Sequence, residues 1–88
     1  MENQNSSAEA RVNITYEGQT GDLPDTVSYD ATDADIRAWV TEAVRGGVPG
    51  IQADSNADFT DFVIDRFVAN AVRPFNLLMV RPKTPFGK

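Results

Sequence analysis

The chain has 88 residues, which is room for one small domain once a polar end is set aside. Apolar residues make up 41% and charged residues 24%, the balance of a folded globular protein rather than of a disordered chain. Thirteen acidic against eight basic residues give a net charge of -5, which repels phosphate backbones and anionic lipid. We therefore expect neither nucleic acid nor a membrane as the partner.

Two missing residue types limit the chemistry further. The chain contains no cysteine and no histidine, which excludes disulfides, thiolate zinc sites and the commonest general base. No apolar run approaches the roughly 20 residues that span a bilayer, and the N-terminus lacks the pattern of a secretion signal. These absences predict a cytoplasmic protein that is not an enzyme and holds no metal or cofactor.

The residue pattern divides the chain into three parts. Residues 1–10 are small and polar and predict a disordered N-terminal arm. Residues 11–80 carry the periodic apolar pattern of a single folded domain. Residues 81–88 contain two prolines and a glycine, which predict an extended tail of basic character.

The domain is expected to begin with a β-hairpin. Residues 11–17 alternate as in a half-buried strand, with one side formed by Val12, Ile14 and Tyr16. Turn-forming residues fill the segment 18–25 and predict a loop. The segment 26–29 alternates briefly again and predicts the second strand of the hairpin.

A capped helix is predicted next. Thr32 stands three residues before Asp35 and just ahead of an apolar-periodic run, which is close to a capping box with Asp in place of Glu. The run forms one stripe at helical spacing: Ile36, Trp39, Val40, Ala43 and Val44. Gly46 and Gly47 stop the run. We therefore expect a helix that begins at about Asp33, ends at these glycines, and packs its stripe, including Trp39, on a sheet.

The segment 59–72 permits two interpretations. As a helix it brings together Phe59, Phe62, Val63 and Phe67; as a strand it places on one face Phe62, Ile64 and Val68. Its density of Phe, Val and Ile favours a strand over 62–68. The compact apolar run 76–80 predicts a central strand buried on both faces.

The order strand, strand, helix, strand, strand resembles that of the ubiquitin-like β-grasp superfamily. The strand 12–16, the passage 27–36 from a strand into a capped helix, and the closing strand 77–80 carry the resemblance. The residues Gly46-Gly47-Val48-Pro49 also resemble the exit of ubiquitin's helix. The resemblance implies an α+β fold of ββαββ order, in which one helix packs across a mixed sheet, and a function in protein–protein contacts.

Two groups of acids could be taken for functional sites. Asp54, Asn56, Asp58 and Asp65 fall at positions 1, 3, 5 and 12 of a calcium loop, but Phe59 replaces the glycine of position 6. A solvated acidic loop is the stronger interpretation. Acids also surround the helix start, namely Asp22, Asp25, Asp30, Asp33 and Asp35. An acid–base pair is the alternative there, whereas turn and cap chemistry is favoured.

The C-terminal tail is the predicted binding segment, and an ordinary flexible terminus is the alternative interpretation. It combines bases with one aromatic anchor, a composition suited to docking in a groove, and its predicted binding residues are Arg81, Lys83, Phe86 and Gly87. Modifiers of the superfamily end in Gly-Gly, whereas this chain ends Pro85-Phe86-Gly87-Lys88, so conjugation would require removal of Lys88.

Three functions follow from these features. The leading hypothesis is a non-catalytic ubiquitin-like adaptor or modifier-like protein that acts through its sheet and tail on a protein partner. The alternative is a small structural subunit of a larger assembly, such as a phage particle. A carboxylate- or Mg-dependent enzyme is the least favoured.

Overall fold

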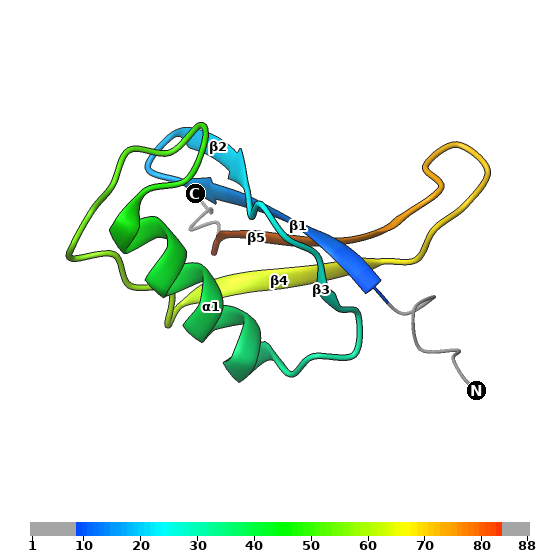
Figure 1. Ribbon diagram of the computed structural model, residues 1–88. Coiled ribbons are helices and arrows are strands. Elements are labelled where there is room, and N and C mark those ends of the chain that lie inside the picture. The colour runs from blue at the N-terminus through cyan, green and yellow to red at the C-terminus, as the bar shows by residue number, and fades with distance from the viewer. Residues whose placement is uncertain (1–8, 84–88) are drawn as a thin grey trace.

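The computed structural model describes residues 9–83, which form an α+β fold with one helix packed on a mixed five-stranded sheet (Figure 1). The elements are β1 (Glu9–Tyr16), β2 (Gln19–Asp22), β3 (Val27–Ser28), α1 (Asp33–Gly46), β4 (Phe62–Phe67) and β5 (Asn76–Pro82). The predicted α+β class is confirmed. No helix in the described range is long and apolar enough to cross a membrane.

The sheet has the order β2-β1-β5-β4, with β3 pairing to the first residues of β1. The central pair, β1 and β5, is parallel, and the outer pairs are antiparallel. The predicted central position of the strand 76–80 is confirmed, but its burial on both faces is wrong. Leu78 and Val80 are fully buried, whereas Leu77 and Met79 are only half-buried, because no second layer covers their face in the part of the chain described.

The hairpin differs from the prediction, since the expected loop 18–25 contains β2. Glu17 and Gly18 join β1 to β2 with φ angles of 52° and 77°, and two successive residues with positive φ are typical of a tight two-residue hairpin turn. The segment Gln19–Asp22 has no apolar side chain that would mark it as a strand. At the other end, β1 begins two residues before the predicted start, and the side chain of Ala10 is buried.

The helix is confirmed at both ends. The Thr32 side chain accepts a hydrogen bond from the Asp35 amide at 3.1 Å, and Gly47, with φ of 92°, donates its N–H to the Val44 carbonyl. Three residues of the predicted stripe are fully buried: Ile36, Val40 and Val44. The prediction for Trp39 is wrong, since 41% of its surface is exposed.

The strand interpretation of 59–72 is confirmed by β4, although the strand ends at Phe67. Phe59 lies in the loop that precedes β4 and fills the core, where its ring centroid lies 4.5 Å from that of Phe62 and 5.1 Å from that of Tyr16. The core between α1 and the sheet consists of Ala10, Val12, Ile14, Tyr16, Ile36, Val40, Val44, Ile51, Ala57, Phe59, Leu78 and Val80.

Candidate interaction surface

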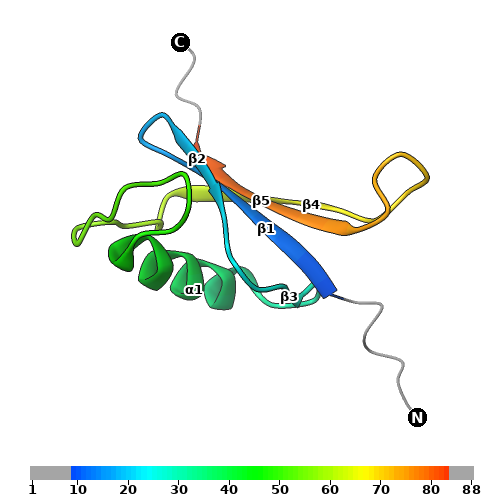
Figure 2. The same ribbon diagram turned by 45° about the horizontal axis from the view of Figure 1, so that its top comes forward.

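The face of the sheet opposite α1, here called the open face, has no covering element within residues 9–83 (Figure 2). Strand alternation places on it the side chains that do not point into the core. They are Arg11, Asn13 and Thr15 of β1, Val63, Asp65 and Phe67 of β4, and Leu77, Met79 and Arg81 of β5. The open face therefore combines apolar side chains with charged ones.

Arginine–aromatic contacts organise one end of the open face. The Arg11 guanidinium lies 4.0 Å from the centroid of the Phe75 ring, close enough for a cation–π interaction. The Arg73 guanidinium lies 5.7 Å from the Phe67 ring and 5.9 Å from the Phe75 ring. Two cations are thus held against aromatic rings, while 40% of the surface of Phe67 stays exposed.

The loop between β4 and β5 continues this surface. Asn70 accepts hydrogen bonds from the amides of Val72 and Arg73, and Arg73 in turn donates to the carbonyls of Val68 and Phe75. These contacts fix the loop, which projects well beyond α1 in Figures 1 and 2. Its two valines are nevertheless presented outward, since Val68 is 62% exposed and Val72 is 95% exposed.

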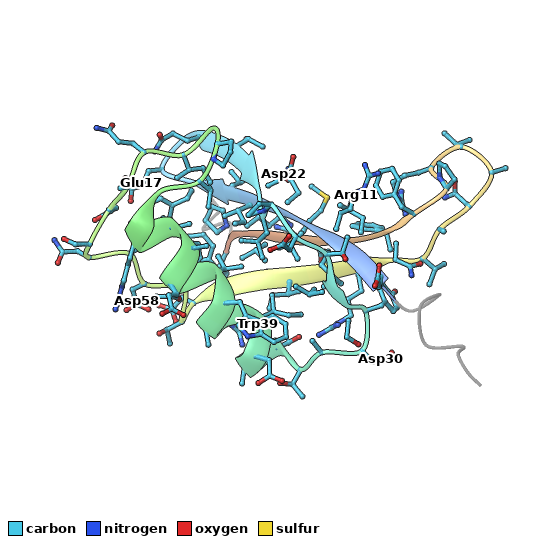
Figure 3. The ribbon with its side chains drawn as sticks, in the orientation of Figure 1. Arg11, Glu17, Asp22, Asp30, Trp39 and Asp58 are labelled. Carbon is cyan, nitrogen blue, oxygen red and sulfur yellow. The ribbon has the colours of Figure 1, made fainter. Side chains whose placement is uncertain are left out.

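A hollow of about 380 Å³ borders the open face between β1 and the segment that follows β2. Its lining consists of Arg11, Asn13, Asp22, Leu23, Pro24, Asp25, Thr26, Phe75 and Leu77. The Asn13 amide donates to Asp22 at 2.9 Å across the β1–β2 pair. Figure 3 shows Arg11 and Asp22 on the side of β1 away from Trp39. The hollow thus offers an apolar floor with a cation and carboxylates at its rim.

The predicted binding residues of the tail do not form one site in the described range. Arg81 lies on the open face, where its Nε donates to Asp65 at 2.6 Å. Lys83 instead lines a second hollow beside the start of β4. Phe86 and Gly87 lie outside the described residues.

The segment 54–65, which carries the calcium-loop spacing, is held by hydrogen bonds within the segment and from Tyr16. Asp54 accepts from the Tyr16 hydroxyl at 2.5 Å and from the Asn56 amide, and Asp58 accepts twice from Thr60. The hydrogen bond from Tyr16 holds the pKa of Asp54 below its ordinary value, and the bonds from Thr60 do the same for the pKa of Asp58. Among residues 9–83, no three or more His, Cys, Asp or Glu side chains are grouped so that they could hold a metal ion.

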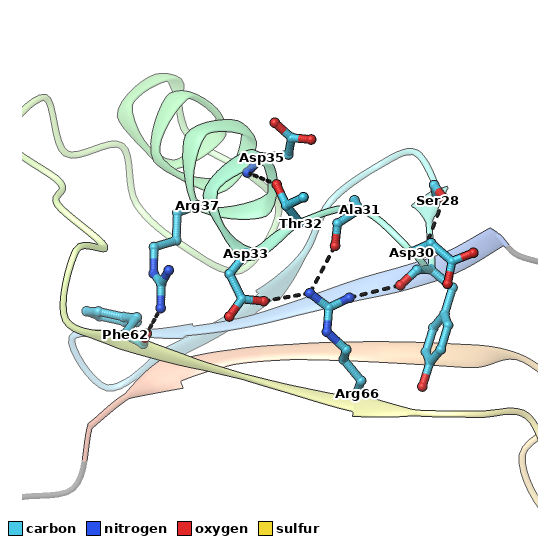
Figure 4. A network of polar contacts seen from close by, with 10 residues as sticks. Ser28, Asp30, Ala31, Thr32, Asp33, Asp35, Arg37, Phe62 and Arg66 are labelled. Carbon is cyan, nitrogen blue, oxygen red and sulfur yellow. Dashed lines mark hydrogen bonds and ion pairs between the residues drawn. The ribbon is translucent and has the colours of Figure 1, made fainter.

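Among the acids near the helix start, Asp33 is held by a structural partner (Figure 4). Arg66 of β4 donates to the carbonyls of Tyr29 and Ala31, each at 2.9 Å, and to the Asp33 carboxylate at 2.5 Å. Arg66 therefore ties β4 to the connection between β3 and α1. Asp33 and Asp35 also stand in the first turn of α1, where carboxylates favour the helix dipole.

Sequence reasoning missed the arginine–aromatic part of the open face, although one signal was present. All thirteen acids lie at or before Asp65, so the chain from Arg66 onward carries bases without any acid. Only part of this basic stretch lies in the predicted tail 81–88, since Arg66 stands in β4 and Arg73 in the loop between β4 and β5. No family model, curated protein or solved structure matches the chain.

Proposed function

We propose that the chain is a non-catalytic protein–protein interaction module of the ubiquitin-like β-grasp type, and that it binds its partner through the open face. A helix that crosses a mixed sheet with a parallel central pair supports the β-grasp assignment. The observation that carries the function is the open face itself, where Leu77 and Met79 are half-buried beside Arg11 and Phe75.

The residue types of the open face suit a protein partner. Arg, Met and aromatic residues are enriched in protein–protein interfaces, whereas Lys, Glu and Asp are depleted there. Arg11 and Arg73 already rest on aromatic rings, so fixing them in a complex costs less side-chain entropy than fixing free arginines. The Asp65–Arg81 pair adds a polar rim.

The C-terminal tail belongs to the same proposal. Arg81 is the first residue of the predicted tail and lies on the open face, so a partner that covers β5 also contacts the start of the tail. In the modifier version, Lys88 is removed and Gly87 becomes the C-terminus. Intact-mass measurement after incubation in an extract of the source cells tests that version, which fails if neither loss of Lys88 nor a covalent adduct appears.

A matched pair of variants tests the open face. Met79→Lys places a charge on the open face, and Ala38→Lys places the same charge on the exposed side of α1. We expect a partner retained from a cell extract by the wild type and Ala38→Lys to be retained at least about tenfold less by Met79→Lys. Circular dichroism and thermal melting confirm that both variants fold. Equal retention by all three proteins contradicts the proposal.

The β4–β5 loop supports a second candidate, a structural subunit of an assembly. A fixed, projecting loop that exposes Val72 is suited to insertion between neighbouring subunits. Sedimentation velocity of the wild type over a range of concentrations tests this role, with Val72→Asp compared with Ala71→Asp. An assembly lost only in Val72→Asp supports it, and a monomer at every concentration contradicts it.

A further inference from the structure

The sheet has two edge strands, β2 and β4, which differ in their neighbours. At the β2 edge, residues 49–52 lie against the strand, and the Gln52 amide donates to the Gln19 side chain at 2.8 Å. The contact is so close that a Cβ added to Gly21 would collide with the Pro49 carbonyl, and one added to Gly50 would collide with the Thr20 carbonyl. Because Gly21 lies opposite the buried Ile14, residues 49–52 pack on the helix side of β2.

At the β4 edge, some backbone groups have a partner and others have none among residues 9–83. Phe62 directs its backbone away from β5, since its N–H donates to the Phe59 carbonyl and its carbonyl accepts from Arg37 at 2.9 Å. Because successive residues of an edge strand alternate between bonding inward and facing outward, Ile64 and Arg66 also direct their N–H and C=O groups outward. Within residues 9–83, these four groups meet no hydrogen-bonding partner.

A hollow of about 340 Å³ lies along the first half of this edge, next to α1. Its apolar part is formed by Phe62 and Ile64, and two cations, Arg37 and Lys83, stand at its border. The Arg37 Nε is buried and has no hydrogen-bond partner among the described residues. Lys83 has no ion pair in the same part of the chain.

The acids beside this hollow neutralise the two cations only in part. The Asp33 carboxylate already binds Arg66 at 2.5 Å, which leaves Asp61 as the second acid of the lining. The hollow therefore favours a ligand that brings a carboxylate to Arg37 and Lys83.

We propose that the β4 edge binds an extended segment of a partner protein as a sixth, antiparallel strand. The inference rests on the proposed interaction role and names a second contact surface for it. The outward N–H and C=O groups of Ile64 and Arg66 form hydrogen bonds with the added strand. The residue opposite Ile64 points to the helix side and is apolar, and the residue two positions later lies opposite Phe62, where a carboxylate meets Arg37 and Lys83.

A second copy of the chain fits this edge less well. An antiparallel pair of β4 strands bonded through Ile64 and Arg66 would place Asp65 opposite Asp65 of the other copy. Like charges directly opposite each other destabilise a strand pair, and each copy carries a net charge of -5.

Titration of the isotope-labelled full chain with a synthetic peptide tests the proposal. The probe is acetyl-Ser-Thr-Lys-Val-Thr-Glu-Ser-amide, in which valine is placed to lie opposite Ile64 and glutamate opposite Phe62. We expect saturable shifts of the Ile64 and Arg66 amide signals and slower hydrogen exchange at both. N-methylation of the valine, whose N–H faces β4, is expected to weaken binding at least about tenfold, whereas N-methylation of the following threonine, whose N–H faces away, leaves it unchanged.

The charge requirement has its own control. Replacing the peptide glutamate by glutamine is expected to weaken binding about twofold to fivefold, and Lys83→Gln is expected to weaken the glutamate peptide but not the glutamine peptide. Shifts confined to Leu77 and Met79 would overturn the edge proposal while supporting the open face. Shifts of Ile64 and Arg66 that grow with protein concentration before any peptide is added would identify a second copy as the occupant and also overturn it.

Discussion

The same three long strands supply both faces of the sheet, yet the two faces are stabilised in different ways. Toward α1, alternate residues of β1 and β5 form a dry layer of small and branched apolar side chains, with Val12, Ile14, Leu78 and Val80 fully buried. Away from α1, the intervening residues include Arg11, which rests on Phe75 rather than in a core. One face stabilises the fold, and the other keeps its side chains accessible.

This difference shows how a small domain can keep apolar surface in solution. Aromatic rings on the open face are partly shielded by guanidinium groups, which cover apolar area with charged groups. The helix-facing side has only one charged residue on β4, Arg66, and three acceptors satisfy it. The Arg11 charge on the open face is therefore available to a partner, whereas Arg66 is committed to the fold.

The largest expected effect is a difference in the free energy of unfolding between variants at two neighbouring residues of β5. Leu78→Ala removes a fully buried side chain and is expected to lower the free energy of unfolding by about 2–5 kcal/mol. Leu77→Ala, on the half-buried open face, is expected to cost about 1 kcal/mol. Urea denaturation of both variants measures the difference. Equal losses would mean that the open face is packed as tightly as the core, which would remove the basis of the comparison.

The second prediction compares two ion pairs that involve strand residues, Arg66–Asp33 and Arg81–Asp65. Arg66→Met breaks three hydrogen bonds that tie β4 to the β3–α1 connection and is expected to cost about 2 kcal/mol. Arg81→Met breaks the more exposed pair with Asp65 and is expected to cost about 0.5 kcal/mol. Both values come from urea denaturation in the same buffer. A larger loss for Arg81→Met would show that the open face carries structural charge.

Trp39 lies at the border of the helix-facing layer and should have an intermediate effect. With 41% of its surface exposed, Trp39→Ala is expected to cost about 1 kcal/mol, against about 3–5 kcal/mol for a buried tryptophan. The wild-type fluorescence should accordingly be quenched by acrylamide. A shielded fluorophore together with a loss above about 3 kcal/mol would place Trp39 in the core.

These cases show which features the sequence predicts. The helix was predictable because Thr32, the stripe and the two glycines are local signals, and local signals act within a few residues. The burial of Trp39 was predicted wrongly because periodicity gives the direction in which a side chain leaves the helix. It does not give the width of the helix surface that the sheet covers. Trp39 stands about 100° around the helix axis from Val40, too far to be covered by the sheet.

The missed features depend on contacts between distant segments. The strand β2 has no apolar side chain and is fixed by the turn at Glu17 and Gly18 and by the cover of residues 49–52. Strand alternation also predicted that Val12, Ile14 and Tyr16 share a face. It could not predict whether the opposite face would be covered, because that depends on where the rest of the chain packs.

The smallest expected effect is the pH dependence of the stability that Tyr16 contributes at the edge of the core. Tyr16 donates to Asp54, and because the hydrogen bond requires the protonated hydroxyl, the pKa of Tyr16 is raised to about 12 from the ordinary value of 10. The unfolded chain therefore loses this proton first. The stabilising contribution is complete below pH 10 and declines as pH rises from 10 to about 12.

Comparison of the wild type with Tyr16→Phe isolates this contribution, because the other groups that titrate in alkali are common to both proteins. We expect the wild type to be the more stable at pH 8, and the difference in the free energy of unfolding to shrink as the pH is raised through the interval between the two pKa values of Tyr16. A difference that stays constant over that interval would show that Tyr16 acts only through the packing of its ring against Phe59 and Phe62, as the other side chains of the helix-facing layer do.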